Sequence, residues 1–344
     1  MKLWKFILGV ILAIIVAGGW LSWDYGQRFF EPNVSLNQSS VEIYVQSDWD
    51  IDDLILELCS HEFILDSNSF RWVAEYKKYN ENVKPGRYLL IDGMNNNQLV
   101  NVLRSENEPI QIVVRSVRTK KELVSSVSSL LELDSTALMG LLSNDGFCQR
   151  YGFNSATIFT LFIPNTYEFY WNTSAEEFLE RMAREYKRFW TDDRKDKATV
   201  LGLSQSDVSA LASIVQSEQA AHVDERPIVA GLYLNRLRKG MRLESDPTLI
   251  HALGDFTIKR VLNIHKQVES PYNTYKYAGL PPGPILLPET TSIDAVLNAS
   301  EHSYIFMCAK EDFSGYHNFS VSYREHINNA KRYQRALNKR NIYR

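Results

Sequence analysis

Glu218 is the residue whose type and position most directly suggest chemistry. It lies in the stretch 204–221, which reads SQSDVSALASIVQSEQAA, and Ser204 with Asp207 is a pattern typical of a helix start. On a helical wheel the apolar residues of this stretch occupy one face, an arc of roughly 160°. They are Val208, Leu211, Ala212, Ile214 and Val215. Glu218 and Gln219 fall inside the same arc, so an acid is expected where an apolar side chain would ordinarily pack.

A carboxyl group on such a face is partly removed from water, which disfavours the ionised form and raises its pKa. Glu218 also lies in the last turn of the predicted helix, where the negative end of the helix dipole acts in the same direction. An acid that stays protonated near neutral pH is suited to general acid catalysis. The alternative is a helix-end glutamate that forms an ion pair with Arg226 or Arg236, and spacing alone favours that alternative.

The segments after Glu218 carry groups that could hold a sugar. A second helix is predicted around Pro227, which is tolerated in a first turn. Three loops follow at 241–248, 272–275 and 279–285, and they are rich in Asn, Thr, Tyr, Gly and Pro. Such loops offer amides and hydroxyls to the polar groups of a sugar, and aromatic rings to its C–H face. The alternative is turn chemistry alone, which is favoured for the Pro-Pro-Gly of the third loop.

The composition excludes several classes of protein. The chain has 344 residues, 44% hydrophobic and 23% charged, which is typical of globular domains rather than disordered or fibrous ones. Its formal net charge of −3 gives no support to a nucleic-acid partner. Cys59, Cys148 and Cys308 are far apart, without a CxxC pair, so neither a zinc site nor a disulfide framework is expected. His317 and His326 have no carboxylate at metal-ligand spacing, so they are interpreted as polar packing or substrate contacts, and no metal or other cofactor is predicted.

The N-terminal residues suggest a membrane anchor. Two lysines precede an uncharged run over 6–23, which as a helix spans roughly 27 Å, close to the hydrocarbon core of a bilayer. Tryptophans at its far edge fit an orientation with the N-terminus in the cytoplasm and the rest outside. The alternative is a cleaved signal peptide, for which Ala17 and Gly19 would suit a peptidase. The apolar run is long for a signal peptide, and bulky Trp20 follows the supposed cut.

The remaining chain is predicted to fold as separate units of helices and strands. A strand at 41–45, helices beginning at Asp48 and Ser69 and a strand at 87–91 form a compact βααβ pattern, extended by a helix at 97–104 and a strand at 110–114. A generic module without a ligand is the alternative. Further along, the sequence predicts helical structure over 119–142, a strand at 157–163, a helix from Ser174 to Trp190, a solvated loop at 192–197 and a strand at 303–307. These strand signals argue against a lysozyme-like helical fold.

Four motifs then appear in a fixed order: ASIVQSE, NRLRKGMRLESDPT, PYNTYKYAGLPPGPI, and HNFS followed by Glu325-His326. This series resembles the endolytic murein transglycosylase family, also called YceG-like, and IPNTYEFYW at 163–171 extends the resemblance. The resemblance implies a single-pass inner-membrane enzyme that cuts nascent peptidoglycan strands internally and ends their elongation. It also implies that Glu218 is the catalytic acid/base. Family members often carry a second glutamate where this chain has Gln216, which leaves Glu218 as the only acid in the motif.

The fold class implied is α+β, with an N-terminal transmembrane helix, a small LysM-like βααβ domain and a larger α+β catalytic domain. A LysM-like module is of a type that binds GlcNAc-containing glycans. The expected divisions are a cytoplasmic tip at 1–5, a transmembrane helix at 6–23, a stalk at 24–40, the LysM-like subdomain at 41–114, the catalytic domain at 115–330 and a C-terminal helix or tail at 331–344.

The implied reaction cleaves the bond between MurNAc and GlcNAc without water. Most glycosidases need two carboxylates, but here Glu218 would protonate the leaving oxygen and then accept the proton of the MurNAc C6 hydroxyl, which closes on C1 to give a 1,6-anhydroMurNAc end. Orientation of an internal nucleophile can replace roughly 7–11 kcal/mol of barrier. Substrate-binding roles are expected for Asn235, Arg236, Asp246, Thr248, Tyr272, Asn273, Tyr275, His317 and Asn318. Asp246 has two further readings, stabilisation of oxocarbenium charge or a structural helix cap.

The expected partners are peptidoglycan strands and, secondarily, peptidoglycan synthases and division proteins. Two other functions stay open. A hydrolase using the same glutamate would admit water and leave reducing ends. A non-catalytic membrane-tethered scaffold would bind glycan through its small domain and recruit cell-wall synthesis or division proteins.

Overall fold

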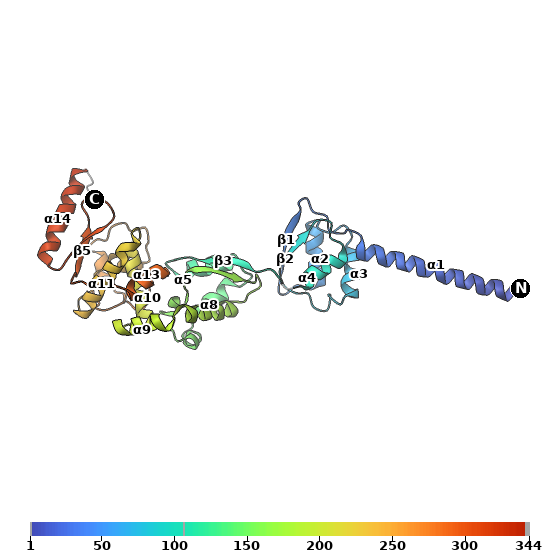
Figure 1. The fold of residues 1–344 in the computed structure, drawn as a ribbon, viewed down its shortest axis with the longest axis horizontal. Helices are drawn as coiled ribbons and strands as arrows, with labels where there is room; N and C mark the ends of the chain where they lie inside the picture. Colours follow the sequence, from blue (N-terminus) through green and yellow to red (C-terminus); the bar gives the residue numbers. More distant parts are fainter. Residues whose placement is uncertain (1, 106, 341–344) are drawn as a thin grey trace. The chain divides into compact units, whose positions relative to one another are not determined.

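The computed structural model describes residues 2–105 and 107–340, and it has the mixed α+β composition that the sequence predicts (Figure 1). Met1 of the expected tip and residues 341–344 of the expected tail lie outside the described residues. The chain divides into two compact units. Unit 1 runs to Ile112 and includes Leu130–Glu132 and Glu168–Thr173, and unit 2 contains Val113–Ser129, Leu133–Tyr167 and the chain from Ser174 onward.

Unit 1 contains α1 Lys2–Phe30, β1 Ser40–Val45, α2 Ile51–Ser60, α3 Ser67–Tyr76, β2 Gly86–Ile91 and α4 Asn96–Arg104. The strand β3 Ile110–Val114 follows, and it pairs with β4 Asn165–Phe169. The strands β1 and β2 are antiparallel, with a register that runs from Ser40 opposite Ile91 to Val45 opposite Gly86. The predicted βααβ order is therefore confirmed.

The core of unit 1 lies where the three short helices pack together with the β1–β2 pair. Its fully buried side chains include Leu54, Leu58, Phe70, Leu90 and Leu99. The cap of α2 differs from the expectation, because Asp50 and not Asp48 accepts the first free backbone N–H groups. Both aspartates precede the same apolar periodicity, and only the position of the first turn distinguishes them.

The helix α1 is long and apolar enough from Trp4 to Phe30 to cross a membrane. It continues past residue 23, so the segment expected as a stalk at 24–40 begins as helix. Two features stabilise this extension. Asp24 and Arg28 form an i,i+4 ion pair of 2.9 Å, and Phe29 packs edge-on against Trp72 of α3, with ring centroids 5.8 Å apart.

Unit 2 contains α5 Lys120–Ser128, α6 Ser135–Ser143, α7 Asp145–Cys148, α8 Ala175–Phe189, α9 Asp192–Leu201, α10 Gln205–Glu218, α11 Arg226–Arg238, α12 Asp246–Leu253, α13 Thr290–Leu297, β5 Phe306–Ala309, β6 His317–Ser320 and α14 Tyr323–Lys339. Short 3₁₀ turns occur at Gln149–Tyr151, Ile158–Leu161, Val223–Glu225 and His265–Gln267.

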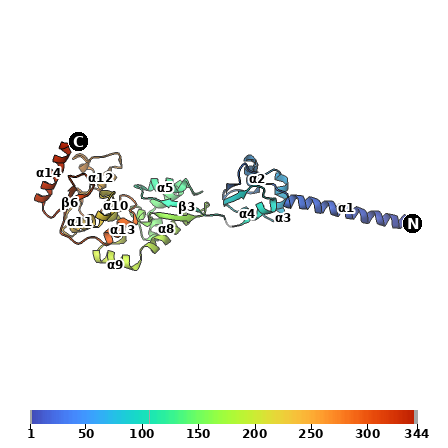
Figure 2. The same ribbon diagram turned by 45° about the horizontal axis from the view of Figure 1, so that its top comes forward.

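The central helix of unit 2 is α10, which packs against α11, α12 and α13 (Figures 1 and 2). Every residue from Val208 to Gln216 is buried, so α10 is enclosed on all sides and not only along the predicted apolar face. Small residues on its other faces permit this close packing. Ser213 is an example, because its hydroxyl donates to the Ala210 carbonyl within the helix and accepts from the Ile285 amide of a neighbouring loop.

The C-terminal part of unit 2 is a β-hairpin covered by a helix. β5 and β6 pair antiparallel, from Phe306 opposite Ser320 to Ala309 opposite His317, and α14 packs against both strands. The predicted strand at 303–307 is thus real but begins at Phe306.

Two local predictions are wrong. The segment 157–163 contains the 3₁₀ turn Ile158–Leu161 and no strand, and the Asn154 side chain closes the preceding turn by accepting from the Thr157 amide. Four consecutive buried residues, Ile158–Leu161, produced the misleading apolar run. The charged segment 192–197 is the start of α9. Acidic residues in the first turn of that helix and the Lys195–Asp192 ion pair favour it, although it has no apolar stripe.

Candidate active site

Glu218 is the last residue of α10, and two hydroxyl groups bind the same oxygen of its carboxyl group. Tyr233 of α11 donates to Oε1 at 2.8 Å, and Ser245, which precedes α12, donates to Oε1 at 2.6 Å. Tyr233 is 2% exposed and Ser245 is 1% exposed, so protein packing fixes both donors. Among the described residues nothing donates to Oε2. The two carboxyl oxygens are therefore distinct, one occupied and one available to a ligand.

Burial raises the pKa of Glu218 above its ordinary value, and the negative charge of Asp246 raises it further. The hydrogen bonds from Ser245 and Tyr233 oppose this shift because they stabilise the ionised form, and the electrostatic effect of nearby His317 acts in the same direction as those bonds. The overall shift of the pKa is upward. This is the setting that the helical wheel predicted for a general acid.

The alternative pairing of Glu218 with an arginine is wrong. Arg226 donates to the Gln219 carbonyl at 2.9 Å and to Glu289 at 2.9 Å. Arg236 donates to the Arg242 carbonyl at 2.8 Å and to Glu244 at 2.6 Å. Both guanidinium groups are buried and serve to join loops to α11, so Glu218 is left with two neutral hydroxyl donors.

Glu218 opens onto a cavity of about 330 Å³ in unit 2. The lining consists of acidic groups, one arginine, aromatic rings and aliphatic side chains. It comprises Glu218, Leu232, Tyr233, Arg236, Leu243, Glu244, Asp246, Tyr275, Ile305, Phe306, Met307, Tyr323 and His326. Four of these residues, Glu218, Arg236, Asp246 and Tyr275, were singled out from the sequence as catalytic or substrate-binding.

Asp246 and Tyr275 form a second polar pair in this cavity. The Tyr275 hydroxyl donates to Oδ1 of Asp246 at 2.6 Å. Burial and the bond to Asp246 raise the pKa of the Tyr275 hydroxyl, which keeps it a hydrogen-bond donor. Asp246 is the first residue of α12, where a carboxylate also interacts favourably with the helix dipole. The structural-cap reading of Asp246 is wrong, because Ser245 occupies the cap position and no side-chain capping bond is made at this helix start. Asp246 is instead a charge that acts on Glu218.

Six predicted substrate-binding residues, His317 among them, do not line the cavity. Asn235 donates to the carbonyls of His302 and Tyr304, and Thr248 donates to the Ser245 carbonyl at 2.7 Å. The others are held in loops or in the hairpin. Asn273 donates to the carbonyls of Lys266 and Val268, Tyr272 packs against His251 with ring centroids 4.6 Å apart, and Asn318 donates to Glu311 at 2.8 Å.

His317 contacts the buried carboxylate of Glu225. Its backbone N–H donates to Oε1 of Glu225 at 2.9 Å, and its Nδ1 lies 2.7 Å from Oε2 of the same residue. Gln219 also donates to Glu225. Because Gln219 follows Glu218 directly, this arrangement anchors the end of α10. Among the described residues no group of three or more His, Cys, Asp or Glu side chains has an arrangement that could hold a metal ion.

Gln216, two residues before Glu218, makes hydrogen bonds that join elements of the fold. Its side-chain oxygen accepts from the Glu289 amide at 2.7 Å and from Ser292 at 3.1 Å, and its Nε2 donates to Ser116 at 3.0 Å. The residue is buried away from the cavity lining. This position therefore joins α10 to α13 and to the segment before α5.

Tyr233 and Ser245 are the important residues that sequence reasoning did not select. Tyr233 lies among leucines in α11 and resembles a core residue, and Ser245 lies inside the LESDPT motif beside the more conspicuous Asp246. A usable signal did exist for Ser245. A serine directly before a helix start usually caps the helix with its hydroxyl. The Ser245 side chain makes no capping bond to α12, so its hydroxyl donates to Glu218 instead.

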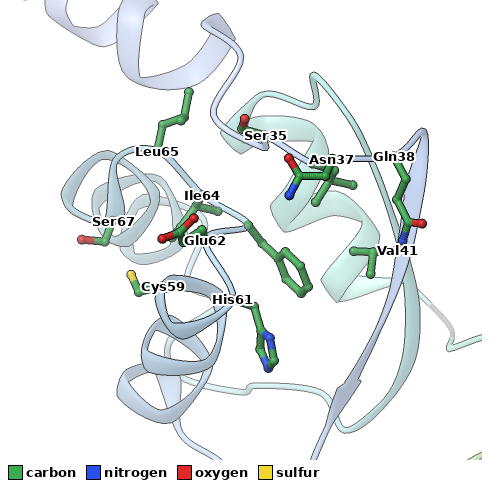
Figure 3. A pocket seen from close by; sticks show the side chains of 12 residues that line it. Ser35, Asn37, Gln38, Val41, Cys59, His61, Glu62, Ile64, Leu65 and Ser67 are labelled. Carbon is green, nitrogen blue, oxygen red and sulfur yellow. The ribbon is translucent and has the colours of Figure 1, made fainter.

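A second cavity, of about 570 Å³, lies in unit 1 (Figure 3). The side chains around it include Asn37, Gln38, Val41 and His61, and the His61 ring stacks on Phe63 with centroids 5.2 Å apart. Its lining thus combines amides and hydroxyls with the stacked ring pair.

The fold and the site can now be compared with known proteins. A family model described as the YceG-like family matches residues 43–332. Because this match covers most of the chain, the protein belongs to the YceG-like family. The crystal structure of a putative YceG-like protein from Listeria monocytogenes superimposes with a TM-score of 0.56 at 24% identity, covering 84% of this chain and 98% of that one. This likeness supports the fold.

Two curated relatives carry the name endolytic murein transglycosylase. The protein of Bacillus subtilis (strain 168) is 25% identical over 348 residues, covering 95% of this chain and 93% of the relative. The protein of Streptococcus pneumoniae serotype 2 (strain D39) is 22% identical over 335 residues, covering 87% of this chain. The alignment spans 60% of the pneumococcal relative's length.

Proposed function

We propose that this protein is a membrane-anchored lytic transglycosylase that cleaves the MurNAc–GlcNAc bond inside nascent peptidoglycan strands and so ends their elongation. The observation that carries the proposal is the state of Glu218. Its carboxyl group has a raised pKa and one oxygen open to a cavity lined by polar and aromatic side chains. The names of the Bacillus and Streptococcus relatives support the same activity at family level.

The two hydroxyl donors assign the reacting oxygen. An oxygen that accepts two O–H hydrogen bonds is disfavoured as the carrier of the acid proton, so the proton resides on Oε2. From there it passes to the glycosidic oxygen as the bond to MurNAc C1 breaks. The resulting carboxylate takes the proton of the MurNAc C6 hydroxyl, whose oxygen bonds to C1. The glutamic acid is regenerated and water takes no part.

Other groups of the cavity have supporting roles in this proposal. Asp246 carries a negative charge that stabilises the oxocarbenium-like transition state, and Tyr275 holds that carboxylate in place through its hydroxyl. Arg236 positions Glu244 and the Ile305 carbonyl, directly before β5, in the cavity lining. His317 acts indirectly, through Glu225 and the end of α10.

The decisive experiment compares the wild-type chain with Glu218→Gln on purified sacculi. The general acid contributes about 10²–10⁴-fold to rate, so digestion by the variant should fall at least about a hundredfold. A matched control is Glu176→Gln, an exposed glutamate of α8. Undiminished digestion by Glu218→Gln would contradict the catalytic role of Glu218, and an absence of digestion by the wild-type chain would favour the scaffold.

Product masses distinguish the lytic reaction from hydrolysis. Each lytic cut leaves a 1,6-anhydroMurNAc end, whose mass is one water lower than that of a reducing end. Reducing ends that depend on Glu218 would identify a hydrolase with the same acid.

A further part of the proposal is that unit 1 binds glycan. We propose that 41–114 is a LysM-like subdomain that binds GlcNAc-containing glycan at the cavity of Figure 3, to which the preceding residues 35–38 also contribute, and that 115–330 is the catalytic domain. Full-length Glu218→Gln should bind insoluble peptidoglycan, and adding Asn37→Ala and His61→Ala should weaken retention. Adding the exposed Lys195→Ala of unit 2 should leave it unchanged. Equal retention of all these variants would contradict the proposal.

The location is proposed to be the inner membrane, with the N-terminus cytoplasmic, α1 in the membrane and the folded chain after α1 outside. The support is the apolar span of α1. An externally added protease should then degrade the folded units in spheroplasts without lysis of the cells. If the folded units were degraded only after the cells were lysed, the orientation would be the opposite one, with these units in the cytoplasm. Peptidoglycan synthases and division proteins remain proposed partners, to be sought by crosslinking in growing cells.

A further inference from the structure

The cavity that contains Glu218 has an aromatic wall formed by β5 and α14. Phe306 of β5 stacks on His326 of α14, with ring centroids 5.3 Å apart and an interplanar angle of 23°. Tyr323, the first residue of α14, packs edge-on against Phe306, with ring centroids 5.9 Å apart and an interplanar angle of 61°. All three rings line the same cavity as the acid. None of them is needed for the proton transfers described above.

Local structure explains how the wall is built. Tyr323 and His326 are three residues apart, so they project from neighbouring positions on one face of α14. Ser322 caps this helix by accepting from the Glu325 amide, which defines its start and therefore the position of Tyr323. The packing of α14 against β5 then brings the two rings to Phe306.

The three rings differ in what they can offer to a ligand. Phe306 is covered on one side by His326, and the Arg236 guanidinium lies 5.8 Å from its centroid. Burial and the charge of Arg236 lower the pKa of His326, so its imidazole is neutral and belongs to the apolar wall. Tyr323 is 65% exposed, and its hydroxyl has no hydrogen-bond partner among the described residues. Tyr323 is therefore the ring that is open to a ligand.

We propose that Tyr323, supported by Phe306 and His326, is a stacking platform for one pyranose ring of the glycan, and that it sets substrate affinity. The inference rests on the proposed function, and it adds a subsite centred on Tyr323 and Phe306, which the sequence did not single out as substrate-binding. The axial C–H groups of a pyranose carry partial positive charge and are attracted to the negative face of an aromatic ring. A large ring at the rim of a cavity also removes apolar area from water when the sugar covers it.

The test measures binding separately from catalysis. Glu218→Gln serves as the parent, and its affinity for a peptide-free GlcNAc–MurNAc tetrasaccharide is measured by calorimetry. Adding Tyr323→Ala should weaken binding about fivefold, as expected for loss of one aromatic contact. Adding Tyr323→Phe should retain the affinity, because the ring face remains. Val321→Ala is the matched control, since Val321 is 50% exposed and lies two residues away, outside the cavity lining.

The same substitutions in the active chain complete the test. Tyr323→Ala should raise KM about fivefold with kcat and the unfolding temperature little changed. If the parent binds the tetrasaccharide and the wild type cleaves glycan, but the Tyr323→Ala variant binds as tightly as the parent, the platform is overturned while the proposed function stands. If the parent binds no glycan and the wild type cuts none, both this inference and the proposed function fail. A fall in kcat with unchanged KM would also overturn the platform.

Discussion

The hydroxyl of Tyr233 donates to Oε1 of Glu218 from the next helix, 15 residues further along the chain. Ser245 donates to the same atom. The acid is therefore held by neutral donors that oppose the effect of burial on its pKa without cancelling it. This balance between desolvation and hydrogen bonding makes the pH dependence of the protein a sensitive test of the site.

Ser245→Ala and Asp246→Asn should move the alkaline limb of the pH–rate profile in opposite directions. A general acid works while it is protonated, so the rate falls as pH rises through the pKa of Glu218. The Ser245 bond lowers that pKa, and its loss should move the limb to higher pH. The Asp246 charge raises that pKa, and its loss should move the limb to lower pH. Profiles of kcat/KM against pH measure both shifts, and movement of both in one direction would contradict the assignment.

Tyr233→Phe should lower kcat about tenfold, the effect of losing one buried hydrogen bond of about 1–1.5 kcal/mol from the reacting acid. Phenylalanine keeps the aromatic ring of Tyr233, so the packing of α11 should persist. KM should change little because the Tyr233 hydroxyl is already bound to Glu218. Steady-state kinetics on soluble glycan measure the effect. Tyr304→Phe, at a ring stacked on Phe319 outside the cavity lining, is the control and should behave as wild type.

Glu218→Gln should stabilise the fold increasingly as pH rises. Above about pH 4.3, the ordinary pKa of a glutamate, the unfolded chain ionises this residue while the folded chain retains the proton. The wild type loses stability over that interval, until pH passes the raised pKa of the folded state. The side-chain amide of the Glu218→Gln variant cannot ionise, so the variant does not lose this stability. Denaturant unfolding at pH 4 and pH 8 measures the difference, and an equal difference at both values would refute a raised pKa.

Asn235→Ala should reduce stability rather than substrate affinity. Its side chain donates to two carbonyls before β5, and their loss should cost about 1–3 kcal/mol in the free energy of unfolding. The exposed Gln334→Ala should stay within about 0.5 kcal/mol of wild type. A raised KM with unchanged stability would instead support the substrate-binding role that the sequence suggested for Asn235.

Features that depend on near neighbours in the chain were predictable. The capping box of Ser174 with Glu177 and that of Ser204 with Asp207 are both present, because each closes over three residues. The alternation of Val41, Ile43 and Val45 with other residues identified β1 for the same reason. By contrast, the apolar run at 157–163 fits a buried strand or a buried turn equally well, and only packing decides between them.

The amino-acid sequence alone placed Glu218 at the end of a helix among apolar neighbours, and it carried the motifs that match the YceG-like family. Periodicity and motif order are properties of the chain itself. The tertiary structure decided which groups surround that acid. Ser245 reaches Glu218 across 27 residues, and Tyr323 lines the same cavity from α14. No local pattern specifies such neighbours, because they are set by how α10, α11, α12 and α14 pack.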